Sequence, residues 1–151
     1  MTPIAILVAT DGSPEALAAA EWLDRWAQPE RTKITVVTVI TPPGASWTMG
    51  TSGFVIDGDV FGKTLQELFE EEKELAKQSL ANTRAQLSHC PPVKEEVLAG
   101  SPAKAIVEYA KKYHMDLIVM GRRGHSALGN LMGSVSFGVL NRSSVPVTVV
   151  S

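Results

Sequence analysis

Residues 120–136 hold the residue types best suited to binding a phosphate. The segment reads MGRRGHSALGNLMGSVS and carries four glycines, which let backbone approach a ligand without interference from a Cβ. Gly133-Ser134 can open a helix, whose free N–H groups and positive dipole end favour an anion. Arg122 and Arg123 offer guanidinium groups that match phosphate oxygens. Spacing alone leaves a second interpretation open, in which the glycines form a tight turn and Gly133-Ser134 only caps a helix.

Asp11 offers a different chemistry, because phosphate would repel its carboxylate. It follows a short apolar run near the N-terminus, and it could accept a hydrogen bond from a ribose or adenine, or hold a metal ion. The hydroxyls of Ser134 and Ser136 are candidate donors to phosphate. These groups form one site only if the fold brings them to one edge.

The apolar pattern predicts a fold that does so. Short buried runs, typical of parallel strands, alternate with segments of helical character. Strands are expected at residues 4–9, 34–40, 93–98, 116–120 and 146–150, and helices at 14–27, 64–87, 102–113 and 134–141. This alternation predicts a single-domain α/β fold over residues 1–151: an open, Rossmann-like, five-stranded parallel sheet with helices on both faces. Ligands of such sheets bind beyond the carboxyl ends of the strands, where Asp11, Val39 and Gly121 are expected.

Local signals refine this prediction. Ser13 suits the N-cap of the first helix and Pro14 its first turn, and Gly100-Ser101-Pro102 repeats the signal. The charged residues Lys94, Glu95 and Glu96 suit a strand at a sheet edge. Residues 41–60 form a long Pro/Gly-rich loop, a candidate lid, partner-contact segment or excursion. An apolar stripe is expected along the second helix, made by Leu65, Leu68, Phe69, Leu75, Leu80 and Leu87.

Composition excludes several classes of function. The net charge of −2 gives no net basic footprint for nucleic acid and leaves open only a local basic patch. Cys90 is the one cysteine, which excludes an intrachain disulfide and a cysteine-based metal cluster and fits a reducing cytoplasm. No segment approaches the ~20 apolar residues of a membrane span, so we expect a cytoplasmic protein. Gly62-Lys63-Thr64 matches the tail of a P-loop, but Asp57 stands where that motif requires glycine.

Three segments carry a resemblance to a known family: VATDGSPEALAAAEW, GSPAKAIVEYAKKYHMDLIVMGRRG, and GSVS followed by VLNRSSVPVTVV. Over nearly its whole length the sequence resembles the universal stress protein family. The nucleotide-binding branch of that family has the pattern Gly-x2-Gly-x9-Gly-Ser/Thr. Gly121 and Gly124 fit the pattern, but eight residues separate Gly124 from Gly133, one fewer than the family has.

The resemblance implies a strand order of 3-2-1-4-5, an ATP site with Mg²⁺, and a homodimer paired through the last strand. By position, Asp11 matches the family's acidic residue near the nucleotide, flanked by Thr10 and by Ala9, where many ATP-binding members have proline. Val39 falls where backbone groups read adenine, and Met120 falls beside the base. The positions that hold phosphates and ribose correspond to Gly121, Arg123, Gly124, Gly133, Ser134, Val135 and Ser136.

The implied function is an ATP-binding regulatory protein with no membrane or nucleic-acid partner. Two alternatives remain from the sequence: a dimeric scaffold that binds no nucleotide, and a slow ATP hydrolase or phosphotransferase. No general base or catalytic lysine is evident, so we assign no catalytic residue and expect at most weak hydrolysis.

Overall fold

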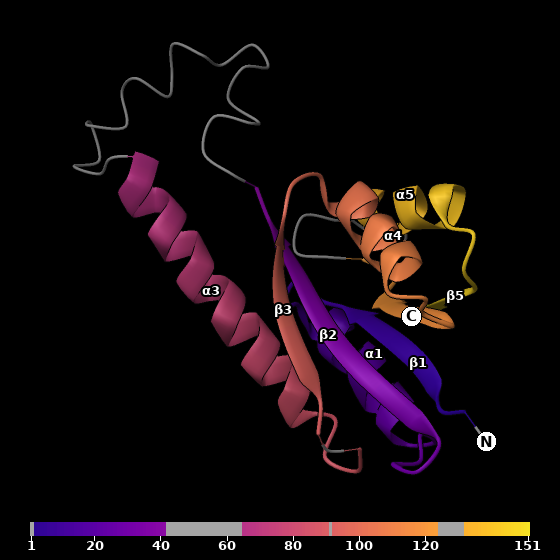
Figure 1. Ribbon diagram of the computed structural model, residues 1–151. Helices are drawn as coiled ribbons and strands as arrows, with labels where there is room; N and C mark the ends of the chain where they lie inside the picture. Colours follow the sequence, from indigo (N-terminus) through magenta and orange to yellow (C-terminus); the bar gives the residue numbers. More distant parts are fainter. Residues whose placement is uncertain (1, 42–64, 91, 124–131) are drawn as a thin grey trace.

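The computed structural model describes residues 2–41, 65–90, 92–123 and 132–151 (Figure 1). The expected loop at 41–60 lies outside these residues except for Thr41, as do Gly62-Lys63-Thr64 and Gly124. The described strands form one parallel sheet in the order β3-β2-β1-β4-β5, which confirms the predicted fold class and strand order. Their bounds are β1 Ile4–Ala9, β2 Thr32–Ile40, β3 Lys94–Ala99, β4 Leu117–Gly121 and β5 Val147–Val150.

The central strands end side by side. Ala9, the last residue of β1, pairs with Val37 of β2 and with Met120 of β4. The strand order changes direction at β1, because the chain moves outward to β2 and β3 and then returns to β4 on the other side. A crevice at such a switch point is the usual ligand position in an open α/β sheet.

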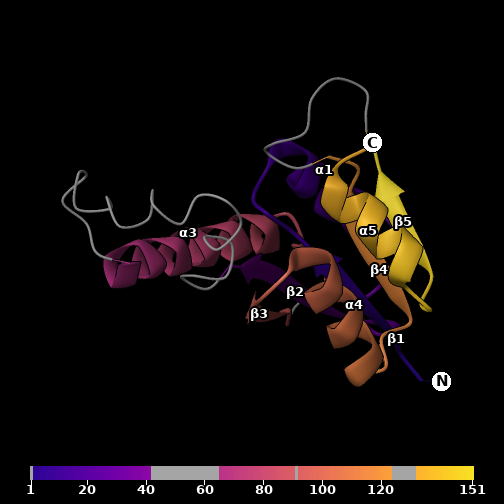
Figure 2. The same ribbon diagram turned by 90° about the horizontal axis from the view of Figure 1, so that it is seen from above.

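Helices cover both faces of the sheet, as predicted. Side chains alternate along β1, so Ile6 and Val8 pack on one face while Leu7 and Ala9 pack on the other. The first face is covered by α1 (Pro14–Asp24) and α3 (Leu65–Ala85), and the second by α4 (Pro102–Lys112) and α5 (Ser134–Arg142). Figure 2 shows α4 and α5 side by side over their face.

The helix starts follow the sequence signals with one difference. Ser13 caps α1, since its Oγ accepts from the Ala16 N–H at 3.2 Å, and Pro14 occupies the first turn. Ser101 also stands at the N-cap position, before Pro102 of α4, but its side chain makes no capping hydrogen bond.

The packing of α3 differs from the expected stripe. Its buried side chains include Ala76, Leu80 and Thr83, and Leu87 is buried just beyond the helix. Leu75 is 62% exposed, so its assignment to the stripe was wrong. The buried positions Ala76, Leu80, Thr83 and Leu87 repeat at helical spacing, whereas Leu75 lies about 100° around the helix from Ala76 and so faces away from the sheet. The first turns of α3 extend beyond the edge of the sheet in both views (Figures 1 and 2).

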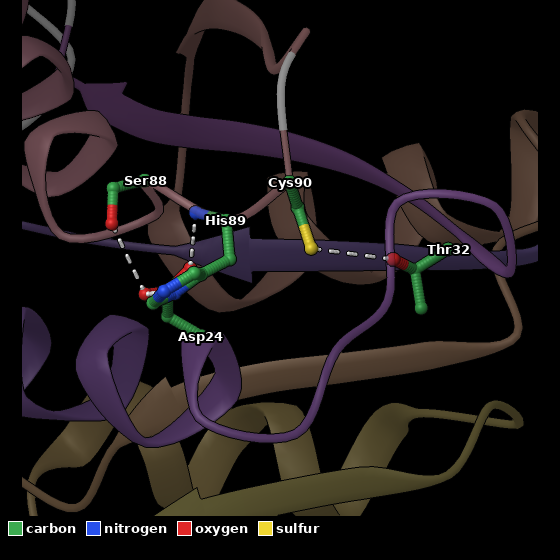
Figure 3. A network of polar contacts seen from close by, with 5 residues as sticks. All are labelled: Asp24, Thr32, Ser88, His89 and Cys90. Atoms are coloured by element: carbon green, nitrogen blue, oxygen red, sulfur yellow. Dashed lines mark hydrogen bonds and ion pairs between the residues drawn. The ribbon is translucent and has the colours of Figure 1, made fainter.

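A polar cluster joins the last residue of α1 to the connection between α3 and β3, near the amino-terminal ends of the strands (Figure 3). The buried Asp24 carboxylate accepts from the His89 backbone N–H at 2.9 Å and from Ser88 Oγ at 3.4 Å, and it contacts His89 Nδ1 at 2.5 Å. Beside it, Cys90 Sγ lies 3.7 Å from Oγ1 of Thr32, the first residue of β2. This cluster fixes the amino-terminal edge of the sheet, away from the strand ends where the predicted site residues lie.

Among the described residues, no helix combines the length and the apolar character that a membrane span requires.

Candidate functional site

A cavity of about 420 Å³ lies at the carboxyl ends of β1, β2 and β4. Its volume falls within the roughly 300–1,000 Å³ usual for small-molecule sites. Eleven of the twelve predicted site residues line it: Ala9, Thr10, Asp11, Val39, Met120, Gly121, Arg123, Gly133, Ser134, Val135 and Ser136. The twelfth, Gly124, lies outside the described residues. Sequence reasoning did not find five further lining residues, which are Ala16, Thr38, Pro102, Ile106 and Met132.

The turn after β1 presents Asp11 at the mouth of the cavity. Thr10 still belongs to the sheet, since its N–H donates to the Val37 carbonyl at 2.9 Å. Asp11 Oδ1 accepts from the Ser13 N–H at 2.9 Å, which holds the carboxylate against the start of α1. Gly12 has a φ of +78°, a conformation that L-residues rarely adopt, so glycine permits this turn.

A chain of hydrogen bonds connects this turn to α3. The Gly12 N–H donates to Thr10 Oγ1 at 3.0 Å, and Thr10 Oγ1 lies 2.8 Å from Thr83 Oγ1. Thr83 Oγ1 donates to the Ser79 carbonyl at 2.7 Å, so the Thr10 hydroxyl is left to donate to Thr83. Ser79 Oγ also donates to the Asp11 carbonyl at 3.3 Å. The backbone that carries Asp11 is therefore supported from α3, a helix that does not itself line the cavity.

Gly121 ends β4 and has little room for a side chain. A Cβ at this position would lie 2.9 Å from the backbone carbon and oxygen of Glu15 and 3.1 Å from the Ala16 nitrogen. The close neighbour of Gly121 is thus the first turn of α1, whereas the sequence interpretation related this glycine to the approach of a ligand. The contact brings α1 and β4 together beside the cavity.

The N-terminus of α5 faces the cavity without a side-chain cap. Gly133 is the N-cap residue and has no side chain to accept from the first N–H groups, and Gly133, Ser134, Val135 and Ser136 all line the cavity. The Gly133 N–H donates to the Arg122 carbonyl at 2.9 Å, which fixes the helix start against the end of β4. Uncapped N–H groups together with the helix dipole make this end of the cavity suited to an anion.

Ser136 uses its hydroxyl within the protein. The residue is buried, and its Oγ lies 2.8 Å from the Gly121 carbonyl oxygen and 2.9 Å from the Arg122 carbonyl oxygen. Its one hydroxyl proton is shared between these two acceptors. In this geometry the hydroxyl ties α5 to β4, and it would have to turn to donate to a ligand. The contact of Ser136 with a phosphate stays a prediction.

Arg123 lines the cavity and forms an ion pair with Glu15 of α1 through Nη2 and Oε1. Both side chains are partly shielded, with 32% of Arg123 and 24% of Glu15 exposed. Sequence reasoning did not single out Glu15, although its place in the first turn of α1 puts it at the same edge of the sheet as Arg123.

Part of the cavity lining is apolar and is called the apolar recess below. Val39, Met120, Pro102 and Ile106 contribute to the lining, and Met120 and Ile106 are almost fully buried. The cavity therefore combines an apolar recess with an anion-binding end and one carboxylate, Asp11. This combination fits a ligand with a flat apolar part, hydroxyls and phosphate.

The described lining residues include few titratable side chains. No lysine or histidine is among them, and the described part of the chain holds no group of three His, Cys, Asp or Glu residues able to bind a metal ion. Asp11 is the one carboxylate that the described lining presents.

Comparison with known proteins identifies the family. The profile of the universal stress protein family matches residues 5–151. The chain belongs to this family. A universal stress protein from Mycolicibacterium smegmatis is 33% identical over 99% of this chain, and the chain spans 48% of that relative. The chain likewise spans about half the length of three other mycobacterial relatives that it matches at 27% identity.

Solved universal stress protein structures share the fold. The protein UspA from Lactobacillus plantarum superposes with a TM-score of 0.78 at 26% identity, over 100% of this chain and 99% of that chain. A universal stress protein described in complex with cAMP superposes with a TM-score of 0.64 at 24% identity, over 100% and 99% of the two chains. The second likeness supports the fold only, and the cyclic nucleotide belongs to that protein.

Proposed function

We propose that this universal stress protein is a cytoplasmic regulatory protein that binds ATP in the cavity at the strand ends. One observation carries the proposal: the uncapped N-terminus of α5 and an apolar recess line the same cavity. A nucleotide needs both, because its base is flat and apolar on its faces while its phosphates are anionic.

The lining suggests an orientation for the nucleotide. Adenine lies in the apolar recess near Val39 and Met120, and the ribose hydroxyls lie near Asp11 and Gly121. The phosphates lie on Gly133, Ser134 and Ser136, with Gly124 as the remaining predicted contact. Mg²⁺ is carried by the phosphate oxygens, which suits an ion that retains waters and needs few protein ligands.

The nucleotide acts as an effector in this proposal, not as a substrate. Asp11 is the one carboxylate among the described lining residues, and its Oδ1 already accepts from the Ser13 N–H. Adenine nucleotides are also the named ligands of two solved proteins of this fold, in complex with cAMP and with dAMP.

The protein is further proposed to form a homodimer through β5. This strand is at an edge of the sheet, and its four residues, three of them valines, are only partly buried. An apolar edge strand needs a cover to prevent uncontrolled pairing. Sedimentation analysis tests the dimer, and a monomer at every concentration up to the millimolar range would contradict it.

Calorimetric titration with ATP and Mg²⁺ tests nucleotide binding, and mass spectrometry of protein purified without added ligand identifies any retained nucleotide. Gly133→Val is the informative variant: φ −64° and ψ 155° suit any residue, so valine fills the anion-binding end without straining the backbone. We expect at least a tenfold loss of ATP affinity, together with a loss of stability of about 1 kcal/mol, because valine is a poorer N-cap residue than glycine.

Asp24→Ala is the matched control, because it removes a buried carboxylate at the opposite edge of the sheet. It should lower stability and leave ATP affinity unchanged. Absence of binding heat and of a thermal shift at millimolar ATP would favour the scaffold alternative. Rapid single-turnover hydrolysis abolished by Asp11→Ala would favour the hydrolase.

A further inference from the structure

The Glu15–Arg123 ion pair connects the first turn of α1 to the segment that leads from β4 toward α5. Arg123 lines the cavity, and its neighbour Arg122 accepts a hydrogen bond from the Gly133 N–H at the start of α5. Arg123 and the helix terminus that suits a phosphate therefore line the same cavity.

We propose that Glu15 competes with the terminal phosphates of a bound nucleotide for Arg123, and so sets how strongly the site distinguishes a triphosphate from a monophosphate. This inference rests on the proposed nucleotide site and adds a specificity-determining residue to it. Glu15 acts through Arg123 and is a positioning residue.

The charges of the cavity support the competition. Asp11 and Arg123 are the charged residues among the described lining, and residues 124–131, GHSALGNL, contain no lysine or arginine. Among the described lining residues, Arg123 is thus the one cation available to a ligand. While it is paired with Glu15, the phosphate end of the cavity receives little net positive charge.

The environment of Glu15 makes its release of Arg123 costly. Its second carboxylate oxygen, Oε2, is buried and accepts no hydrogen bond from the described residues. Arg123 is consequently the main compensation for a carboxylate that is about three-quarters buried. A phosphate that takes Arg123 leaves this charge poorly compensated, and that cost reduces the gain from each guanidinium contact.

The number of phosphates decides whether this cost arises. The N–H groups of α5 can hold the first phosphate of a nucleotide without Arg123. A longer phosphate chain reaches beyond them and requires the guanidinium. Glu15 should therefore weaken the binding of ATP and have little effect on AMP or adenosine.

Titration calorimetry of the parent protein and of Glu15→Gln with adenosine, AMP and ATP tests the proposal. Glutamine keeps the size of the side chain and removes its charge. We expect roughly tenfold tighter ATP binding, the scale of one charge-assisted hydrogen bond, and a change below twofold for AMP and adenosine. Equal tightening of ATP and AMP, or none, overturns the inference while leaving the nucleotide site in place.

Two controls separate competition for Arg123 from a general charge effect. Glu21→Gln makes the same charge change at an exposed position further along α1 and should not alter ATP affinity. In an Arg123→Gln background, Glu15→Gln should lose its effect on ATP, because the two residues act as one unit. If the effect persists there, Glu15 acts by through-space repulsion and the proposal fails.

Thermal unfolding of each variant verifies the fold. Should Glu15→Gln prove too unstable, Glu15→Asp keeps the charge and shortens the reach to Arg123. It should give a smaller gain for ATP and again none for AMP. Absence of any ATP gain in a folded Glu15→Asp variant would overturn the proposal.

Discussion

Replacing Gly121 with alanine tests the contact that joins β4 to α1 beside the cavity. An added Cβ would lie 2.9 Å from the Glu15 carbon and oxygen, whereas nonbonded carbon atoms prefer about 3.5–4.0 Å. The atoms it meets belong to the backbone, so no side-chain rotation can remove the overlap. The first turn of α1 must move away by roughly 0.5–1 Å, the gap between that separation and the preferred one.

The expected destabilisation follows from two opposing contributions. Overpacking of a tight interior typically costs about 1–3 kcal/mol. Alanine also restricts the unfolded chain, which returns about 0.4–1 kcal/mol wherever the native backbone suits it. At the midpoints of these two ranges the net loss is about 1.3 kcal/mol. For a domain of this size each kcal/mol lowers Tm by about 2–4 °C, so a decrease of roughly 3–5 °C is expected.

Denaturant and thermal unfolding measure the stability of Gly121→Ala, and titration calorimetry measures its affinity for ATP. Movement of α1 displaces Ala16, which lines the cavity, so ATP affinity should fall as well. Gly138→Ala is the matched control. Its Cβ would meet only the Ala103 Cβ, at 2.8 Å, and Ala103→Gly should restore a good part of the lost stability. A Gly121→Ala protein as stable as the parent would refute the reasoning.

Two further predictions concern groups outside the cavity. Thr83→Val removes the fully buried hydroxyl that links Thr10 to α3. Denaturation should show a stability loss of about 1–3 kcal/mol, and calorimetry should show weaker ATP binding. Unchanged ATP affinity would mean that α3 does not support the turn at Asp11. Burial raises the pKa of Tyr109 above its ordinary value of about 10, and the hydrogen bond to Glu96 raises it further. The folded state therefore favours the neutral phenol, which contributes stability below pH 10 that is lost as the pH rises further. Tyr109→Phe should lose stability at neutral pH and decline less steeply than the parent above pH 10, and parallel stability curves would contradict this.

The sequence predicted the elements well because their signals are local. Four short apolar runs and the more polar run at residues 93–98 predicted the strands to within two residues, and Ser13-Pro14 predicted the start of α1. The strand order is a long-range property that these signals do not contain, and it came from the resemblance to a family. Leu75 was assigned wrongly because the buried face of α3 also uses Ala76 and Thr83, which are not large apolar residues, and Leu75 lies off the row that they form with Leu80 and Leu87.

The predicted lining residues lie together at one cavity, but several of their contacts could not be predicted. The proximity of Gly121 to Glu15, and of Ser136 to the end of β4, depends on distances between segments that are far apart in the chain. Composition and spacing indicate which groups are available. They do not indicate whether a hydroxyl or a guanidinium is already engaged within the protein, as those of Ser136 and Arg123 are.

These engaged groups relate binding to stability. The Ser136 hydroxyl holds α5 against β4, the Gly121 backbone contacts α1, and the Arg123 guanidinium joins that same helix through Glu15. A ligand that recruits Ser136 or Arg123 must therefore exchange a bond within the protein for one to itself, and each exchange changes how α1 and α5 are held at the strand ends. One arrangement keeps the internal bonds of Ser136 and Arg123, and the other gives them to the ligand. A ligand can shift the equilibrium between these two arrangements only by its different affinity for them. In the proposed ATP complex that difference would be concentrated at the phosphates, because Ser136 and Arg123 are the predicted phosphate contacts and neither belongs to the apolar part of the lining.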